Sequence, residues 1–279
     1  MTDHYQEALL KLINKGLLDR HMRILVGCGG THDRDTLIAL GFKNVTISNL
    51  DVRVDGSQFS PYAWSFQDVE NLTFKDHEFD FCVVHDGLHH CHSPHRGLLE
   101  LYRVAKGGVL VFEPRDTLLS RLGVKLNFGQ EYEVGAVFAN DSVYGGVRNS
   151  GVPNYVYRWT EREIEKTIAS YAPWARHRFI YFRQMRIPWG HYRLMKNKLK
   201  LAAIILALPV LRILTWLFPR QSNTFGFAVI KPADRDMHPW LQRNNGEFKL
   251  NSAWFEERYR DNKAPVDFAH ISEKSSQSK

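Results

Sequence analysis

The sequence predicts an α/β fold built on a doubly wound, mostly parallel sheet. Short apolar runs typical of buried strands alternate with helical patterns of apolar residues, and this alternation is typical of βαβ units with right-handed crossovers. With 279 residues, of which 44% are hydrophobic, the chain can bury the core of one large domain. The predicted strands span residues 23–26, 45–50, 79–84, 109–113, 178–183 and 225–230.

Boundary signals support the predicted helices. Gly41 suits the C-cap of a helix that follows the first strand, and Thr160 with Glu163 three places later forms a capping box. The predicted helices span residues 5–18, 32–40, 95–105 and 159–170.

These elements define one domain over residues 20–235, preceded by a helical segment, residues 1–19. Within the domain, residues 115–158 are rich in Gly, Asn and Tyr and have weak periodicity, which predicts a long functional loop or lid. Residues 236–279 form a polar C-terminal tail that ends in SEKSSQSK, a composition typical of disorder.

The N-terminal sequence favours a cytoplasmic protein. MTDHYQEALLKLINKG mixes charged with apolar residues and lacks the basic start and apolar stretch of a secretory signal. The three cysteines, Cys28, Cys82 and Cys91, are too few for a disulfide framework in a chain of this length, so we expect reduced thiols.

The ends of the first two predicted strands carry residues suited to a ligand. An open parallel sheet binds its ligand at the carboxyl ends of its strands. Gly27, Gly29 and Gly30 follow the first strand, where the missing Cβ atoms let backbone approach a ligand and a helix N-terminus favours a negative group. Asn49 and Asp51 follow the second strand and could hydrogen-bond ribose hydroxyls. Plain turns are the alternative at both strand ends.

Residues 67–114, QDVENLTFKDHEFDFCVVHDGLHHCHSPHRGLLELYRVAKGGVLVFEP, carry a family resemblance. They resemble the core of class I methyltransferases that use S-adenosylmethionine (SAM), of methyltransferase type 11, similar to the small-molecule enzymes of ubiquinone biosynthesis. Members of that family carry an acidic residue before "enLPF", then "FD", "LHH", "ELYRVLKPGG" and a strand ending in "EP". The resemblance implies a Rossmann-like fold, a last strand that returns antiparallel, SAM as cofactor and transfer of its methyl group.

Carried over to this chain, the resemblance assigns cofactor contacts. It places Gly27 and Gly29 beside the methionine part of SAM, with Gly30 and His85 as further contacts. It places Asp68 at the adenine amino group and Val69 beside the adenine ring.

Three positions depart from the family pattern. Leu25 stands where the family has an acidic residue, Thr31 where it has a third glycine, and Asn49 where it has the ribose acid, with Asp51 two places later. Residues 51–66 are also too short and irregular for the usual third helix. These departures sustain a second hypothesis, in which the chain is an inactive SAM- or nucleoside-binding scaffold associated with a membrane.

The strand end HDGLHH lies where members of the family contact both the cofactor and the substrate. Methyl transfer needs alignment of the methyl group with the acceptor, and a base only if the acceptor must lose a proton. Histidine suits that role near neutral pH. His90 is the first candidate for a base or a substrate contact, and Asp86 is the second. The alternative is that both residues only cap the strand and the helix that follows it.

Two other site chemistries were weighed for this region. Histidines and cysteines crowd around this strand end, but their spacing matches no structural zinc pattern, so we expect no metal. A dehydrogenase is disfavoured because GCGGTH lacks the third spaced glycine of G-x-G-x-x-G. The residues of the rejected metal cluster are Cys28, His85, His89, His90, Cys91, His92 and His95.

The basic charge of the chain is concentrated near an apolar insertion. Residues 166–233 carry twelve Lys or Arg and no Asp or Glu, whereas the whole chain has a net charge of +7. Within them, residues 186–223 connect the last two strands, where the family usually has a short turn. They begin with RIPWGHYRLMKNKLK and continue as the apolar run 201–218, interrupted by Pro209 and Arg212.

This pattern predicts an interfacial hairpin rather than a membrane-spanning helix. Trp189, Tyr192 and Trp216 suit the headgroup level, and the cations suit an anionic inner leaflet. We therefore expect peripheral membrane attachment through residues 186–220 and a small-molecule, lipid or lipid-linked acceptor. An apolar lid or a dimer contact is the alternative.

No helix-turn-helix, zinc finger or RNA-binding signature supports nucleic acid as a partner. Side chains of the predicted lid are candidates for acceptor contacts, namely Tyr132, Glu133, Tyr144, Arg148 and Tyr155.

Overall fold

The computed structural model describes residues 4–186, 198–232, 237–244 and 247–260. It divides into two compact units, which are described separately. The first unit comprises residues 1–173 and 177–231, and the second comprises residues 174–176 and 232–279. The predicted headgroup contacts Trp189 and Tyr192 lie outside the described residues.

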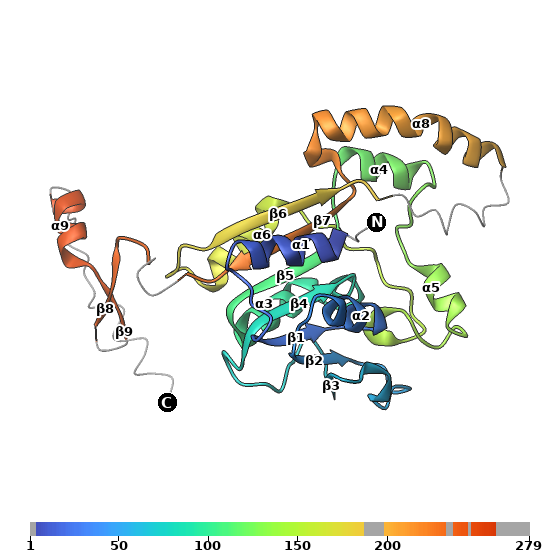
Figure 1. The fold of residues 1–279 in the computed structure, drawn as a ribbon. Helices are drawn as coiled ribbons and strands as arrows, with labels where there is room; N and C mark the ends of the chain where they lie inside the picture. Colours follow the sequence, from blue (N-terminus) through green and yellow to red (C-terminus); the bar gives the residue numbers. More distant parts are fainter. Residues whose placement is uncertain (1–3, 187–197, 233–236, 245–246, 261–279) are drawn as a thin grey trace, which may run out of the picture. The chain divides into compact units, whose positions relative to one another are not determined.

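The first unit is built on a seven-stranded sheet in the order β3-β2-β1-β4-β5-β7-β6 (Figure 1). Strands β1 to β5 pair in parallel, and β7 lies antiparallel between β5 and β6. The predicted doubly wound sheet with an antiparallel last strand is therefore confirmed. The strands are β1 Arg23–Gly27, β2 Asn44–Asn49, β3 Ala63–Phe66, β4 Phe79–His85, β5 Ala105–Pro114, β6 Arg178–Gln184 and β7 Thr224–Ile230.

Strand β3 was not predicted from the sequence, and its burial pattern explains why. This edge strand has only exposed or half-buried residues, so its sequence AWSF lacks the alternation of a strand with one buried face. In place of the family's third helix, the chain before β3 has only the short 3₁₀ helix Ser57–Phe59.

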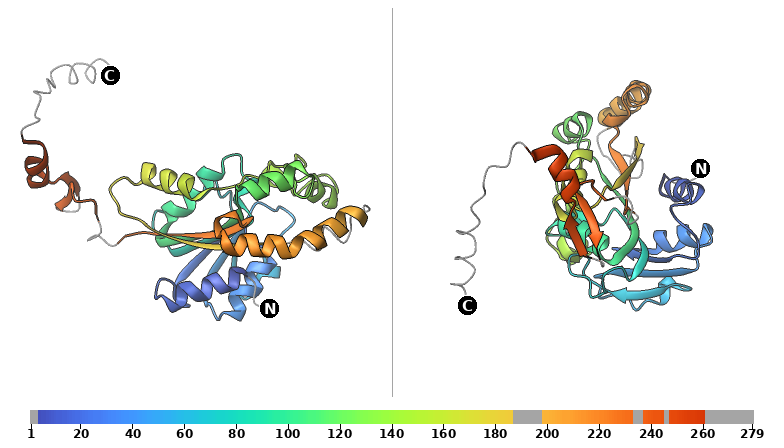
Figure 2. Two further views of the ribbon diagram at one scale, coloured as in Figure 1. Left: turned by 90° about the horizontal axis from the view of Figure 1, so that it is seen from above. Right: turned by 90° about the vertical axis from the view of Figure 1, so that its left-hand side faces the viewer.

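Helices cover both faces of the sheet, as the left view of Figure 2 shows. Helices α1 and α2 pack on one face through residues such as Leu9 and Leu37. Helices α3 and α6 pack on the other face through residues such as Leu98 and Ile164. The helices are α1 His4–Asn14, α2 Thr31–Ala39, α3 Pro94–Val104, α4 Leu118–Lys125, α5 Val134–Ala139, α6 Glu161–Tyr171 and α8 Lys198–Leu217.

The topology gathers the strand ends that matter for function. The sheet order reverses between β1 and β4, which are neighbours although β2 and β3 intervene in the sequence. A crevice therefore opens at the carboxyl ends of β1 and β4. Strand β6 runs parallel to β5, so the connection that follows β6 starts at this same edge.

The predicted lid, residues 115–158, contains two short helices that periodicity did not reveal. Helix α4 has eight residues, none of them buried, and α5 has six. Helices this short complete too few turns for a clear apolar stripe. The 3₁₀ helix Val147–Asn149 follows them, with Arg148 in a left-handed conformation.

The apolar run, residues 201–218, lies almost entirely in one helix, so the hairpin predicted there is wrong. Helix α8 runs without a break through Pro209. A proline removes one backbone hydrogen bond and strains the preceding turn, but here the helix continues past it. No helix among the described residues is long and apolar enough to cross a membrane. The 3₁₀ helix Pro219–Gln221 leads from α8 to β7.

The second unit contains secondary structure that the sequence analysis did not predict. Aromatic side chains hold it together: the rings of His238 and Trp240 stack at 4.2 Å, and Trp240 lies 5.8 Å from Trp254. The strands themselves are mostly exposed, so they carry no buried alternation in the sequence. The elements are the antiparallel strands β8 Leu241–Asn244 and β9 Glu247–Leu250 and the helix α9 Ser252–Tyr259.

A glycine in β7 tests the packing of the sheet. Gly226 lies in register between Phe112 of β5 and Phe182 of β6, whose rings stack 6.5 Å apart. A Cβ atom on Gly226 would lie 2.5 Å from Phe112 Cε1. Gly226→Ala should therefore lower the free energy of unfolding by about 1–3 kcal/mol in urea denaturation.

Gly123→Ala in α4 is the matched control, because a Cβ atom there meets nothing within 4 Å. It should leave the unfolding free energy unchanged or raise it by up to about 1 kcal/mol. Equal unfolding free energies for the two variants would contradict the described packing.

Candidate functional site

A cavity of about 350 Å³ lies at the carboxyl ends of β1, β2 and β4. Six of the predicted cofactor contacts line it, together with both predicted reaction-centre residues. The predicted contacts Gly27 and His85 do not line it. The predicted residues at this cavity are Gly29, Gly30, Asn49, Asp51, Asp68, Val69, Asp86 and His90.

The glycine turn brings backbone to the cavity wall. Gly29 packs so closely that a Cβ atom would lie 2.7 Å from Val26 Cγ1 and 2.8 Å from Ile47 Cγ2. The amide of Gly30 donates to Asp33 Oδ2 at 2.9 Å, which fixes the start of α2. Gly27 instead faces the core, where a Cβ atom would lie 3.0 Å from Leu101 Cδ2.

Polar contacts tie the end of β2 to this turn. Asn49 Nδ2 donates to the carbonyl of Gly29 at 2.8 Å, and Asn49 Oδ1 accepts from the amide of Asp51 at 3.1 Å. The carboxylate of Asp51 lies on the cavity wall and binds Arg53 Nη2 at 2.6 Å. Hydrogen bonds from Arg53 lower the pKa of Asp51. Asp51 therefore supplies an ionised carboxylate at the cavity wall. The family pattern has its ribose acid two residues earlier, at the position of Asn49.

Asp68 joins the cavity wall to the lid. Its Oδ1 accepts from the amide of Glu70 at 2.9 Å, and its Oδ2 pairs with Arg148 Nη2 at 2.7 Å. Val69 beside it is buried. The sequence analysis named Arg148 as a lid candidate but missed its neighbours Gly145, Gly146 and Asn149, which also line the cavity. The adjacent glycines in a Gly-rich lid were the available signal.

A second cavity, of about 800 Å³, adjoins the first and shares Asp86 and His90 with it. Its wall is mainly apolar and comes from α4, the segment after α4, and α8. Two cations, Arg158 and Arg186, also line it, and Arg186 Nη1 pairs with Asp86 Oδ2 at 3.1 Å. Burial lowers the pKa of Arg158. The apolar wall consists of Pro114, Leu119, Leu122, Val124, Leu126, Phe128, Val156, Met185, Ala203, Ile204, Ala207, Leu208 and Leu211.

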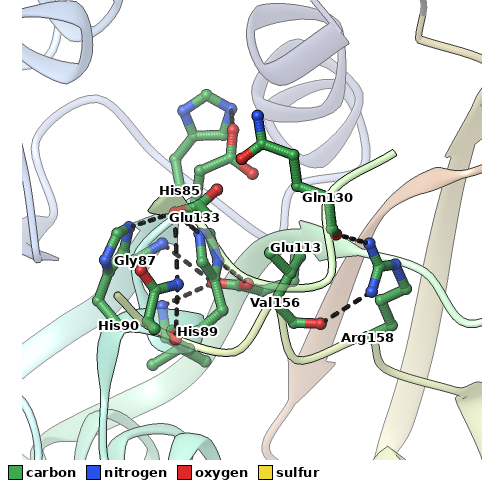
Figure 3. Close-up of polar contacts among 12 residues, drawn as sticks. His85, Gly87, His89, His90, Glu113, Gln130, Glu133, Val156 and Arg158 are labelled. Carbon is green, nitrogen blue, oxygen red and sulfur yellow. Dashed lines mark hydrogen bonds and ion pairs between the residues drawn. The ribbon is translucent and has the colours of Figure 1, made fainter. Parts of the chain in front are cut away.

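The buried carboxylate of Glu113 organises the end of β4 (Figure 3). Its Oε1 accepts from the amides of Gly87 at 3.0 Å and Leu88 at 2.6 Å. Its Oε2 accepts from His89 Nδ1 at 2.6 Å. Burial by itself would lower the pKa of His89, but Glu113 and Glu133 outweigh it and raise that pKa well above its ordinary value.

Glu133 of the lid reaches both histidines of this strand end (Figure 3). Its Oε2 lies 3.6 Å from His89 Nε2 and 3.4 Å from His90 Nε2. Burial opposes ionisation of Glu133, but its contacts with the two histidines lower its pKa to about 2. Burial and the adjacent His89 lower the pKa of His90.

The structure separates most of the other residues that crowd together in the sequence. His85 stacks on Tyr5 with ring centroids 4.9 Å apart, outside both cavities. His92 is exposed, and His95 Nε2 pairs with Glu163 Oε1 at 3.0 Å. Cys28 and Cys91 line the smaller cavity, so only His89 and His90 meet Glu133.

The remaining lid candidates lie elsewhere. Arg53 stacks over the ring of Tyr144 at 4.3 Å from its centroid. Tyr132 and Tyr155 contact each other with ring centroids 5.5 Å apart, and neither lines a cavity. Tyr132, Tyr144 and Tyr155 therefore lie outside the walls of both cavities, and their contact with an acceptor stays a prediction.

A family model matches part of the sequence, and solved structures match the fold. The family model of the methyltransferase domain matches residues 24–112, from β1 into β5. No curated protein matches the sequence. The YcgJ protein of Bacillus subtilis is 14% identical, and the match covers 83% of this chain and 100% of that chain with a TM-score of 0.50.

Two further solved structures resemble the chain at TM-scores of 0.47. Magnesium protoporphyrin IX methyltransferase of Synechocystis PCC 6803, with bound S-adenosylhomocysteine, is 12% identical over 82% of this chain and 84% of its own. Phosphoethanolamine N-methyltransferase 2 of Haemonchus contortus, in complex with SAM, is 14% identical over 82% of this chain and 52% of its own.

At such identities a solved structure bears on the fold alone, and the likeness to the YcgJ protein agrees with the sheet described above. The family match adds the sequence of the first five strands and the turns between them. It includes the glycine turn, Asp68 and the strand end with His89 and His90. The chain therefore carries a methyltransferase domain, matched over residues 24–112, on a Rossmann-like sheet.

Proposed function

We propose that the chain methylates a largely apolar acceptor with a polar reacting group, from SAM held in the smaller cavity. One observation carries this proposal: the two cavities share Asp86 and His90 at the end of β4. Methyl transfer is an in-line displacement and requires the sulfonium methyl group and the acceptor atom to be aligned and shielded from water. Two adjoining cavities with a common wall supply such an arrangement.

The lining of the smaller cavity suits the parts of SAM. The backbone of Gly29 and Gly30 and the start of α2 would meet the methionine carboxylate, because helix N-termini favour anions. Asp51 would accept hydrogen bonds from the ribose hydroxyls. Asp68 would accept one from the adenine amino group, with Val69 beside the ring.

The larger cavity suits an acceptor with a long apolar portion. Its polar groups lie at the end shared with the smaller cavity, where Asp86 and His90 would contact the reacting group. The apolar portion would lie between α4 and α8, and Arg158 could pair with an anionic substituent. A lipid or lipid-linked small molecule has this combination of properties.

Helix α8 supports delivery of such an acceptor from a membrane surface. One side of the helix faces the larger cavity through residues such as Ile204 and Leu208. The other side is also apolar yet exposed, with Leu206 78% and Trp216 77% accessible. A surface helix that is apolar all round requires a second apolar environment. We propose that this is an anionic membrane, contacted on its cytoplasmic face without being crossed.

The cofactor assignment is tested at Asp68. Asp68→Asn removes the carboxylate while keeping its size, and it should weaken SAM binding about 10- to 100-fold in titration calorimetry, the loss expected for a hydrogen bond to a charged group. Asp35→Asn is the control, because Asp35 is exposed on α2 and pairs only locally with Arg34. It should bind SAM like the unmodified protein.

A third variant, Arg148→Gln, separates direct contact from an effect on the lid. It leaves Asp68 in place and removes the cation that pairs with it. If Asp68 contacts SAM directly, Arg148→Gln should lose less SAM affinity than Asp68→Asn. Equal losses, or unaltered binding by Asp68→Asn, would refute the assignment of Asp68 to SAM.

Membrane attachment is tested on the outer side of α8. The triple substitution Leu206→Ser, Val210→Ser and Ile213→Ser removes three exposed apolar side chains from one face. Burying each large apolar side chain contributes about 1.5–3 kcal/mol, so the variant should float with anionic liposomes at least about tenfold less than the unmodified protein.

The control is Ile38→Ser with Val52→Ser, two exposed apolar residues away from α8. It should float like the unmodified protein. If the unmodified protein does not float, or if the triple variant floats equally well, α8 does not bind the membrane. Its outer side would then be a contact for another protein chain.

A further inference from the structure

Three side chains with metal-binding atoms converge where the two cavities meet. One ring nitrogen of His89, one of His90 and an oxygen of Glu133 all lie within 4.8 Å of one another, and no other group of three such residues occurs among the described residues. We propose that His89, His90 and Glu133 bind one divalent transition-metal ion, zinc or ferrous iron, with an open coordination position facing the larger cavity.

The two distances from Glu133 to the histidines fit a metal ion. Tetrahedral zinc has bonds of about 2.0–2.1 Å to histidine nitrogen and carboxylate oxygen, which places its ligand atoms about 3.3 Å apart. Glu133 Oε2 lies 3.4 Å from His90 Nε2 and 3.6 Å from His89 Nε2. These separations exceed a good hydrogen bond by several tenths of an ångström, whereas they match the edge of a coordination polyhedron.

The surroundings hold the ligand atoms in place. His89 donates from Nδ1 to the buried carboxylate of Glu113 at 2.6 Å, so its Nε2 is left to face Glu133. Metal-bound histidines commonly bond a carboxylate through their other nitrogen. Asn154 Nδ2 donates to Glu133 Oε2 at 3.3 Å and to the carbonyl of His89 at 3.2 Å. A metal ion would displace any proton shared between His89 and Glu133.

The ligand types indicate the class of metal. Two imidazoles and one carboxylate suit zinc and ferrous iron, whereas magnesium and calcium prefer oxygen ligands alone. Three protein ligands leave at least one coordination position open, as in metal sites that bind a substrate. All three residues line the larger cavity, so an oxygen or nitrogen atom of its occupant would reach that position.

The site differs from the histidine and cysteine cluster that sequence spacing excluded. That cluster is dispersed in the fold, and the third ligand comes instead from the lid, more than forty residues later in the chain. The inference is also independent of the proposed function, because metal binding is measurable without SAM or acceptor.

The experiment titrates untagged, chelator-stripped protein with Zn²⁺ in a calorimeter and, separately, with Co²⁺ by visible absorption. We expect one equivalent of Zn²⁺ to bind with a Kd of about 1 µM or lower, and Co²⁺ to give the absorption of a four- or five-coordinate site. His90→Gln and Glu133→Gln should each weaken binding at least tenfold. Both side chains are partly exposed, so their substitution leaves the core intact.

His92→Gln is the matched control, since His92 is exposed and lies two positions from His90. It should bind both ions like the unmodified protein, and circular dichroism confirms that each variant is folded. Absence of stoichiometric Zn²⁺ binding would overturn the proposal. Unchanged binding in folded His90→Gln and Glu133→Gln would overturn it as well. Titration of the same samples with SAM reports separately on the proposed function.

Discussion

The buried carboxylate of Glu113 is the contact on which the arrangement of the site depends. A buried carboxylate is strongly unfavourable unless its oxygens are paired or hydrogen-bonded. Here three donors satisfy it, the amides of Gly87 and Leu88 and the ring of His89, all from the turn after β4. This requirement fixes the path of the turn. It thereby places Asp86, before the turn, and His90, after it, on the wall shared by the two cavities.

The lid is attached to this fixed turn mainly through charged groups. Arg148 pairs with Asp68 across the smaller cavity, and Glu133 reaches His89 and His90 beside the larger one. Helix α4 of the lid has no buried residue, so the lid has little core of its own at that end. A ligand that binds Asp68 or Glu133 therefore competes with a lid contact.

The two sides of helix α8 have different surroundings. Ile204 and Leu208 on its inner side complete the wall of the larger cavity, whereas Leu206 on its outer side remains exposed to solvent. A helix with two apolar sides is stable only if both are covered. The same sequence that closes the cavity thus creates a surface that requires an apolar partner. An acceptor that enters from that partner would have a short route into the cavity.

The sequence by itself determined the sheet and six of its seven strands, because apolar runs bounded by glycines and capping residues are local signals. It also identified eight of the residues that line the smaller cavity, since the carboxyl ends of parallel strands must meet at one edge. It missed β3 and the second unit, whose residues are too exposed to show periodicity, and it predicted a hairpin where α8 is one helix.

Only the tertiary structure decided which of the crowded histidines lie together. All four lie within residues 85–95, but His85 turns to Tyr5 and His95 to Glu163, whereas His89 and His90 meet Glu133 from the lid. The position of His89 depends on Glu113, which orients its ring. The grouping with His90 depends on Glu133, a lid residue far from both histidines in the sequence. Such long-range pairing is set by packing and by the satisfaction of buried charge, for which local sequence patterns carry no signal.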